Sequence, residues 1–234
     1  MKWGLTMRKI CLFDADGTLF DFDAAEERAL DMLMEYCKIT EKQNALDVYQ
    51  KINHALWKKL EEGTVTMERL KLQRFEEFIE AQHLNKQASE LAEYFMDRLS
   101  EGNQLIENAE KTLRNLSKKY DCHIITNGIT RIQVSRLNHS VIQPYIKHLF
   151  ISEQIGVSKP NPAYFDYVKK TLNISDADQL IVIGDSLTSD MQGAINSNLT
   201  SIWYNPKHHD VPHHMKLDAV ISNLIELEEI IDKL

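Results

Sequence analysis

Residues 10–18 read Ile-Cys-Leu-Phe-Asp-Ala-Asp-Gly-Thr, an apolar run that ends in two carboxylates and a Gly-Thr turn. The run predicts a buried strand, which places Asp14 and Asp16 at its carboxyl end. In an open α/β sheet that edge is where ligands bind. Two neighbouring acids repel each other unless a cation or a reaction uses them. The stretch therefore predicts an α/β fold with a site at the mouth of its sheet.

Five further apolar runs repeat the strand pattern along the chain. Helical patterns separate most of them, which is the rhythm of a parallel sheet built from strand–helix–strand units. We therefore expect a doubly wound parallel α/β core formed by residues 1–21 and 105–234. The expected strands are Ile10–Phe13, His123–Thr126, Leu149–Ser152, Leu180–Gly184, Ser201–Tyr204 and Ala219–Ile221.

Residues 22–104 break this rhythm, because they show no strand pattern and almost no Gly or Pro. Their apolar side chains recur at helical spacing in four groups, and Glu-Gly pairs at 62–63 and 101–102 mark helix ends. By itself, this pattern predicts a helical subdomain inserted between the first two strands. The four groups are Leu30, Leu33, Met34 and Cys37; Ile52, Leu56 and Leu60; Leu70, Phe75 and Phe78; and Leu91, Phe95 and Leu99.

The composition is that of an ordinary globular protein: 43% of the 234 residues are hydrophobic and 26% are charged. A net charge of −8 argues against a nucleic-acid polymer as partner. The three scattered cysteines imply no disulfide framework, and no apolar stretch is long enough for a signal peptide or a membrane span. We expect a cytoplasmic monomer or weak dimer without membrane contact, starting at either Met1 or Met7.

Two other strand ends carry groups that suit a phosphate. Thr126 ends a buried run and is followed by Asn127-Gly128, so that its hydroxyl and the following backbone N–H groups can hold phosphate oxygens. Lys159 precedes Pro-Asn-Pro and a helix start, where it can present a fixed positive charge to phosphate and to Asp14. Taken alone, the first string is an ordinary turn and the second a solvated lysine.

A fourth string, residues 181–190, is a buried run followed by Asp185 and, five residues later, Asp190. Mg²⁺ prefers hard oxygen ligands and keeps several waters. Asp14, Asp185 and the backbone carbonyl of Asp16 are the expected ligands, with Asp190 as a supporting or water-mediated partner. Taken alone, the string also fits a helix cap at Ser189.

These four strings, in this order, resemble the motifs of the haloacid dehalogenase (HAD) superfamily of phosphohydrolases. The resemblance implies a Mg²⁺-dependent phosphatase in which Asp14 is the nucleophile and Asp16 is the general acid and base. Thr126, Asn127 and Lys159 would bind phosphate, and 22–104 would be a type-1 helical cap. The halogen-cutting branch usually lacks the second acid, so Asp16 argues against dehalogenation. A P-loop is excluded, because no G-x-x-x-x-G-K-[ST] string occurs.

A closer resemblance is to the noncanonical pyrimidine nucleotidases, the YjjG/YfnB-like group of 5'-nucleotidases. It implies hydrolysis of pyrimidine nucleoside monophosphates, with specificity set by the cap. Phe22, Asn53, Trp57 and Arg74 are the candidate contacts to the base or ribose, although aromatic residues at helical spacing also fit a cap core. The resemblance rests on Phe20–Glu26, Ile52–Trp57, Glu61–Gly63, Arg74-Phe75, Ile125–Gly128, Phe150–Glu153 and Trp203–Pro206.

Several alternatives stay open. Within enzymes they are a sugar-phosphate or phosphoglycolate-type phosphatase and a phosphomutase, which would release no free phosphate. Outside enzymes the alternative is a catalytically silent HAD-fold binding protein, against which the complete acid and lysine set argues. A final histidine group, His208, His209, His213 and His214, lies in a Pro-flanked loop without zinc-type spacing, so we interpret it as a solvated loop.

Overall fold

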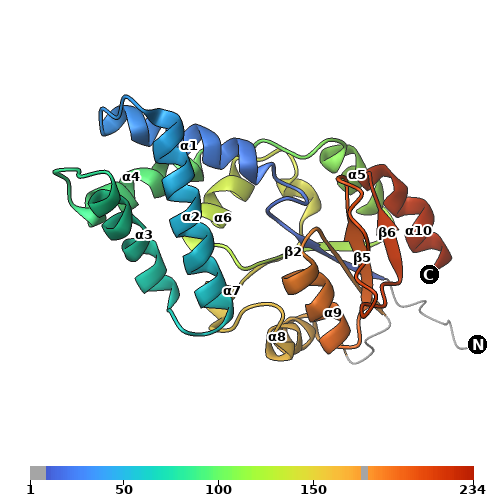
Figure 1. Cartoon of the computed structure of the whole chain (residues 1–234). Helices are drawn as coiled ribbons and strands as arrows, with labels where there is room; N and C mark the ends of the chain where they lie inside the picture. Colours follow the sequence, from blue (N-terminus) through green and yellow to red (C-terminus); the bar gives the residue numbers. More distant parts are fainter. Residues whose placement is uncertain (1–8, 175–178) are drawn as a thin grey trace, which may run out of the picture. The chain divides into compact units, whose positions relative to one another are not determined.

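A parallel sheet of six strands forms the centre of the core in a computed structural model that describes residues 9–174 and 179–234. Figure 1 shows how its strands and the surrounding helices follow one another along the chain. The strand order is β3-β2-β1-β4-β5-β6, and every neighbouring pair is parallel. This confirms the predicted doubly wound α/β core. The strands are β1 (Ile10–Asp14), β2 (Asp121–Thr126), β3 (Leu149–Ile151), β4 (Leu180–Gly184), β5 (Thr200–Tyr204) and β6 (Ala219–Ile221).

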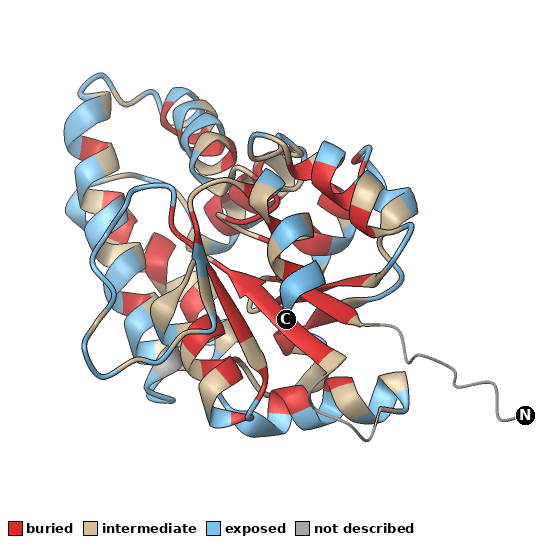
Figure 2. Cartoon of the chain, turned by 90° about the vertical axis from the view of Figure 1, so that its right-hand side faces the viewer, coloured by how far each residue is buried: buried red, intermediate tan, exposed pale blue. Residues whose placement is uncertain are grey.

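Alternate residues of each strand face opposite sides of this sheet, and each side is covered by its own helices. Cys11 and Phe13 pack against the apolar residues of α5 (Ala109–Leu116) and α10 (Leu227–Lys233). Leu12 instead packs with α8 (Pro162–Leu172) and α9 (Gln192–Asn196). Because both faces are covered, the central strands are buried along their length, which Figure 2 shows in red. That explains why they are continuous apolar runs in the sequence.

The strand order places the switch in winding direction between β1 and β4. From β1 the chain proceeds to β2 and β3 on one side, whereas β4, β5 and β6 extend the other side. The carboxyl ends of parallel strands share one edge, so Asp14, Thr126 and Gly184 end at that edge. Such a switch point is where open α/β sheets leave room for a ligand.

Short helices complete the core unit. They are α6 (Thr130–Asn138), α7 (Ser152–Ile155), 3₁₀ turns at Gln143–Tyr145 and Leu224–Glu226, and a π turn at Leu187–Met191. Ser152, expected at the end of a strand, instead begins α7 and is buried. No helix in the described part of the chain has the length and apolar character needed to cross a bilayer.

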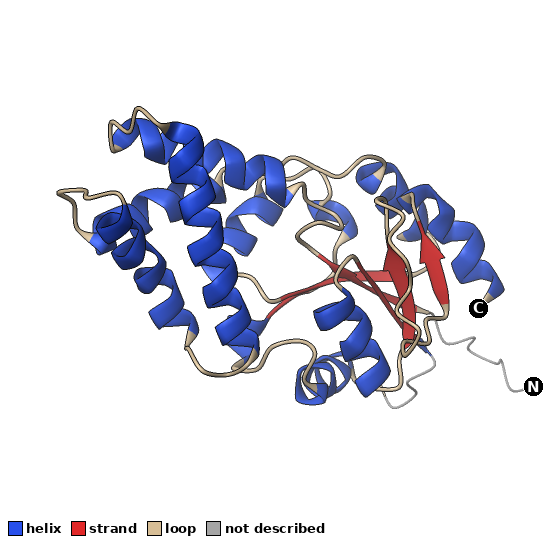
Figure 3. Ribbon diagram, in the orientation of Figure 1, coloured by secondary structure: helices blue, strands red, loops and turns tan. Residues whose placement is uncertain are grey.

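The helices inserted after β1 form a helical cap, as predicted. They are α1 (Phe22–Tyr36), α2 (Lys42–Glu61), α3 (Met67–Ala81) and α4 (Ala88–Ser100), and Figure 3 shows them without a strand between them. The side chain of Thr66 caps α3 by accepting a hydrogen bond from the backbone N–H of Arg69. Inside the cap the rings of Tyr49, Phe75 and Phe95 pack with centroids 5.6–5.8 Å apart.

The chain separates into two compact units: the chain up to Phe22 with Asn103–Leu234, and Asp23–Gly102. The chain leaves the core unit after Phe22 and returns to it at Asn103, and the core segments next to these two points lie side by side. There the backbone N–H of Asp21 donates to the carbonyl of Gln104 at 3.0 Å, and Phe20 forms an antiparallel bridge with Leu105. Hydrogen bonds within the core unit thus join the segment that precedes the cap to the segment that follows it.

Candidate active site

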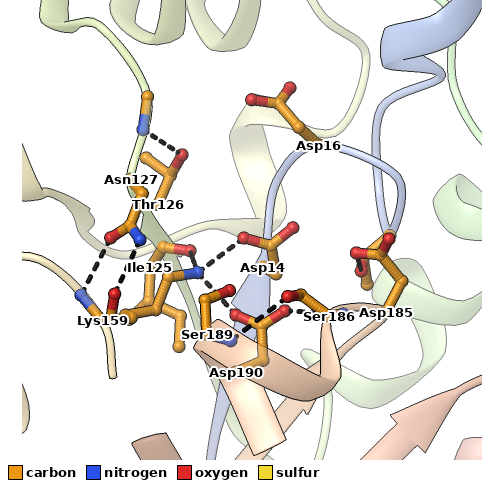
Figure 4. A network of polar contacts seen from close by, with 12 residues as sticks. Asp14, Asp16, Ile125, Thr126, Asn127, Lys159, Asp185, Ser186, Ser189 and Asp190 are labelled. Atoms are coloured by element: carbon orange, nitrogen blue, oxygen red, sulfur yellow. Dashed lines mark hydrogen bonds and ion pairs between the residues drawn. The ribbon is translucent and has the colours of Figure 1, made fainter. Parts of the chain in front are cut away.

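Lys159 joins two of the predicted acids at the centre of the site (Figure 4). Its ammonium donates to Asp14 Oδ1 at 2.6 Å, to Asp190 Oδ1 at 2.7 Å and to the carbonyl of Ile125 at 3.0 Å. The side chain is only 2% exposed. Burial lowers the pKa of Lys159, but the carboxylates of Asp14 and Asp190 more than offset it, so the net shift is upward. Lys159 is therefore a fixed positive charge beside Asp14.

Asp190 holds this lysine from the turn that follows β4. One oxygen of its fully buried carboxylate accepts from Lys159, and the other accepts from the backbone N–H of Ser186 at 3.1 Å. The Ser186 hydroxyl in turn accepts from the backbone N–H of Ser189 at 3.2 Å. Both oxygens of Asp190 are thus engaged within the protein, which agrees with a supporting position near a metal ion.

Asp14, Asp185 and Asp190 form an acidic cluster in which one oxygen of each lies within 4.8 Å of the others. Burial and then the carboxylate of Asp190 raise the pKa of Asp14 well above its usual range. The same two causes raise the pKa of Asp185 to about 6. The direction of both shifts agrees with the geometry, in which a single lysine faces three clustered carboxylates. Carboxylate oxygens are the hard ligands that Mg²⁺ prefers, and the excess negative charge of this cluster suits a divalent cation.

Two residues contact Asp185 and a third leaves room for it, and the sequence patterns predicted none of these contacts. The Thr18 hydroxyl donates to its Oδ1 at 3.2 Å, and the indole N–H of Trp203 donates to its backbone carbonyl at 2.8 Å. Gly17 has a φ of +86°, and a Cβ there would lie 2.7 Å from Asp185 Oδ2. A side chain at position 17 would therefore be strained and would displace the acid.

The loop Thr126-Asn127-Gly128 connects the end of β2 to Lys159. The Thr126 hydroxyl accepts from the N–H of Gly128 at 3.0 Å and keeps its own proton for another acceptor. The Asn127 amide exchanges two hydrogen bonds with the backbone of Lys159, each 2.9 Å long. Beneath them, the Tyr164 hydroxyl accepts from the N–H of Thr126 and donates to the carbonyl of Phe150. The side chain of Asn127 thus fixes the lysine loop.

Asp16 lies apart from the acidic cluster. Its carboxylate accepts hydrogen bonds from Gln133 and Arg136, both on α6. Figure 4 shows it turned away from Asp14, Asp185 and Asp190. The sequence predicts that Asp16 binds metal through its backbone carbonyl alone. The position of its carboxylate therefore concerns the predicted acid–base role and not the metal site. The sequence held one clue to these partners, namely two polar residues at i and i+3 on the buried face of α6.

Of the four predicted cap contacts, the structure brings two together. Arg74 Nη1 donates to Asn53 Oδ1 at 3.4 Å, and the Asn53 amide donates to Glu26 Oε1 at 3.3 Å. Arg74 is 2% exposed, and its guanidinium lies 5.1 and 4.9 Å from the ring centroids of Phe75 and Phe95. Arg74 is therefore also part of the packed cap interior.

The other two cap candidates are partly exposed. Trp57 lies on α2, one turn after Asn53. Phe22 begins α1, and its ring centroid lies 5.9 Å from the guanidinium carbon of Arg136.

Two curated relatives are similar over most or all of the chain. Pyrimidine 5'-nucleotidase PynA of Streptococcus pneumoniae is 37% identical over 86% of this chain and 85% of its own length. Pyrimidine 5'-nucleotidase YjjG of Escherichia coli is 32% identical over 100% of both chains. Each match exceeds the length of the core unit, so it includes residues of the cap.

A solved structure and a family model agree with these relatives. The crystal structure of the HAD-hydrolase YfnB of Bacillus subtilis, bound to magnesium, superimposes with a TM-score of 0.88 at 33% identity, covering 96% of this chain and 99% of that one. The model of the haloacid dehalogenase-like hydrolases matches residues 8–198, which include all four motifs. This chain therefore belongs to the haloacid dehalogenase-like hydrolase family.

Proposed function

We propose that this protein is a Mg²⁺-dependent phosphatase that hydrolyses nucleoside 5'-monophosphates, pyrimidine ones first. The observation that carries the chemistry is the buried Asp14 at the end of β1, ion-paired with a lysine that Asp190 holds in place. The substrate class is supported by PynA and YjjG, which are pyrimidine 5'-nucleotidases. The partner is thus a small phosphorylated metabolite.

The reaction takes place in two halves at Asp14. A carboxylate oxygen of Asp14 bonds to phosphorus while the bond from phosphorus to the ester oxygen breaks, and Asp16 gives its proton to the departing oxygen. A water then attacks phosphorus and passes its proton to Asp16. The bond between phosphorus and Asp14 breaks, and phosphate leaves. Lys159 and the Thr126 hydroxyl bind the phosphate oxygens, whose negative charge they stabilise.

Asp14, Asp185 and the backbone carbonyl of Asp16 would hold Mg²⁺, with Asp190 supporting the group through Lys159 and Ser186. When bound, the ion supplies positive charge that offsets the acids and the phosphate. That charge also explains how a phosphate dianion can approach a buried carboxylate.

The direct test is a phosphate-release screen with Mg²⁺ over pyrimidine and purine nucleoside monophosphates, sugar phosphates and 2-phosphoglycolate. We expect the pyrimidine monophosphates to have the highest kcat/KM and to yield free phosphate, which a phosphomutase would not release. Asp14→Asn should abolish release while the far-UV spectrum is unchanged. Equal rates across all bases would contradict the nucleotidase assignment, and full release from Asp14→Asn would contradict the mechanism.

A further inference from the structure

Two side chains of α6 determine where the Asp16 carboxylate points. Gln133 Nε2 donates to Oδ2 of Asp16, and Arg136 Nη1 donates to Oδ1, so each oxygen has its own donor. Gln133 is 2% exposed and Arg136 is fully buried. Residues three apart in a helix lie on the same face, so this pair forms one rigid surface against Asp16.

Arg136 cannot easily move away from this position. Its guanidinium lies 4.7 Å from the centroid of the Phe20 ring and 5.9 Å from that of Phe22. A buried guanidinium that loses its counter-ion is strongly destabilising, and Asp16 is its ion-pair partner. Because packing fixes the guanidinium, the N–H that it donates in turn fixes the carboxylate oxygen that accepts it.

Gln133 connects Asp16 to the phosphate-binding loop. A Cβ added to Gly128 would lie 2.3 Å from Nε2 and 2.8 Å from Cγ of Gln133, so the amide packs directly on the backbone of that loop. Its orientation is determined as well, since a carboxylate only accepts hydrogen bonds and must face the amide nitrogen. The loop that follows β2 and the loop that follows β1 therefore meet through one side chain.

We propose that Gln133 and Arg136 are positioning residues that hold the Asp16 carboxylate for proton transfer at the leaving oxygen. This rests on the proposed acid–base role of Asp16. A carboxylate without these donors would sample several rotamers, and proton transfer loses rate when the donor is not held in place. Neither residue need touch the substrate, because both act through Asp16.

The test compares two substrates that differ in their need for an acid. The leaving group of a nucleoside monophosphate is the basic 5'-alkoxide of the nucleoside, whereas that of p-nitrophenyl phosphate is a stable phenolate. Because proton transfer is worth about 10²–10⁴ in rate, Arg136→Met and Gln133→Leu should lower kcat on the nucleotide by about ten- to a hundredfold. We expect little change in kcat on the aryl phosphate and little change in either KM.

A double-mutant cycle separates positioning from general damage. If both residues act through Asp16, adding Arg136→Met or Gln133→Leu to Asp16→Asn should cause no further loss, because the group they orient is already absent. Arg136→Lys should restore part of the activity lost in Arg136→Met. The matched control is Arg131→Met, which removes an exposed arginine from the same helix and should leave both substrates unaffected.

The outcomes distinguish this proposal from the one it rests on. If Asp16→Asn slows both substrates equally, the acid–base role of Asp16 is refuted, and the positioning proposal falls with it. If Asp16→Asn discriminates between the substrates but Arg136→Met and Gln133→Leu slow both equally, only the positioning proposal is refuted. Additive losses in the double variants would have the same meaning. Gln133→Leu removes no charge, so it keeps the test decisive if Arg136→Met fails to fold.

Discussion

Lys159 is the residue on which the electrostatic balance of the site depends. It is the ion-pair partner of both Asp14 and Asp190, which are themselves buried. Removing one partner of a buried ion pair is costly because the remaining charge stays uncompensated. Removing one acid from a cluster with excess negative charge should not lower stability in the same way, because it relieves the repulsion between carboxylates.

This asymmetry predicts opposite stability effects for two inactive variants. Lys159→Met should lower the free energy of unfolding by about 3–5 kcal/mol, measured without metal, whereas Asp14→Asn should leave it unchanged or raise it. Neither variant should release phosphate. Urea unfolding followed by circular dichroism gives both values. A stable Lys159→Met, or an Asp14→Asn as unstable as Lys159→Met, would contradict the charge balance described for the cluster.

His123 predicts a pH dependence away from the active site. It is 2% exposed, and neither ring nitrogen has a hydrogen-bond partner in the described part of the chain. Burial, followed by nearby His148, lowers its pKa from 6.5 to about 4; Lys147 also lowers it, and Asp121 opposes. The folded state therefore keeps this imidazole neutral. Its contribution to stability is complete above pH 6.5 and is lost as the pH falls towards 4.

Replacing this ring should flatten the acid side of the stability curve. Between pH 7 and pH 5, wild type should lose about 1–2 kcal/mol of unfolding free energy more than His123→Phe. Phenylalanine keeps the ring and loses no hydrogen bond. His139→Phe, at an exposed position, serves as the control and should follow wild type. Identical slopes for wild type and His123→Phe would show that His123 titrates normally.

Two candidate residues of the cap helices differ in their surroundings. Trp57 on α2 is partly exposed, whereas Arg74 on α3 is enclosed by Phe75 and Phe95. If the cap selects the leaving group, Trp57→Ala should lower kcat/KM for the pyrimidine nucleotide by about ten- to a hundredfold, since a lost stacking partner costs about 1–3 kcal/mol. The rate on p-nitrophenyl phosphate should be kept.

Arg74→Ala provides the contrast, because removing a buried side chain also loosens the cap. We expect a lower Tm together with a loss on the nucleotide. If Trp57→Ala instead slows both substrates equally and also lowers Tm, Trp57 is a packing residue of the cap and makes no specificity contact.

The elements themselves were predictable from the sequence to different degrees. Leu180–Gly184 matches its expected bounds, because a strand covered on both faces must be apolar throughout. Ala219–Ile221 also matches its expected bounds, although it is an edge strand whose Val220 is exposed. Four cap helices follow from helical spacing and from the Glu-Gly pairs that end two of them. The prediction for Ser152 is wrong, because a serine after an apolar run fits both a strand end and a helix start.

The contacts within the site were less predictable than its motifs. Each motif acid or lysine follows a recognisable local string, so the sequence could nominate it. Arg136 reaches Asp16 across 120 positions of the chain, and Tyr164 reaches Thr126 across 38. Which partners meet depends on the crossing of helices over the sheet, and no local pattern encodes that. Trp203 lies in a segment that resembles the nucleotidases, yet nothing in that segment predicts its hydrogen bond to the Asp185 carbonyl.

For the whole molecule, the acidic cluster predicts that Mg²⁺ stabilises the fold. A ligand that binds only the folded state adds RT ln(1 + [L]/Kd), which is about 2.7 kcal/mol at a concentration of 100 Kd. Wild type should therefore show a Tm that rises with Mg²⁺ and returns to its starting value in EDTA. Asp185→Asn should show a much smaller rise. Asp218→Asn should respond to Mg²⁺ like wild type, because Asp218 lies outside the cluster and its carboxylate accepts a hydrogen bond from the Ser201 hydroxyl. Equal shifts in all three proteins would place the ion elsewhere.

The contacts between Asp21 and Gln104 and between Phe20 and Leu105 bear on how the cap of such a protein can be exchanged. The two ends of the inserted segment are joined by hydrogen bonds of the core unit. The segment can therefore be replaced as a whole at one position of the fold. A cap from a related protein, spliced at Phe22 and Asn103, would leave the strand order intact. Substitutions within residues 23–102 can therefore change the cap without disturbing the hydrogen bonds that join the two chain segments on the core unit.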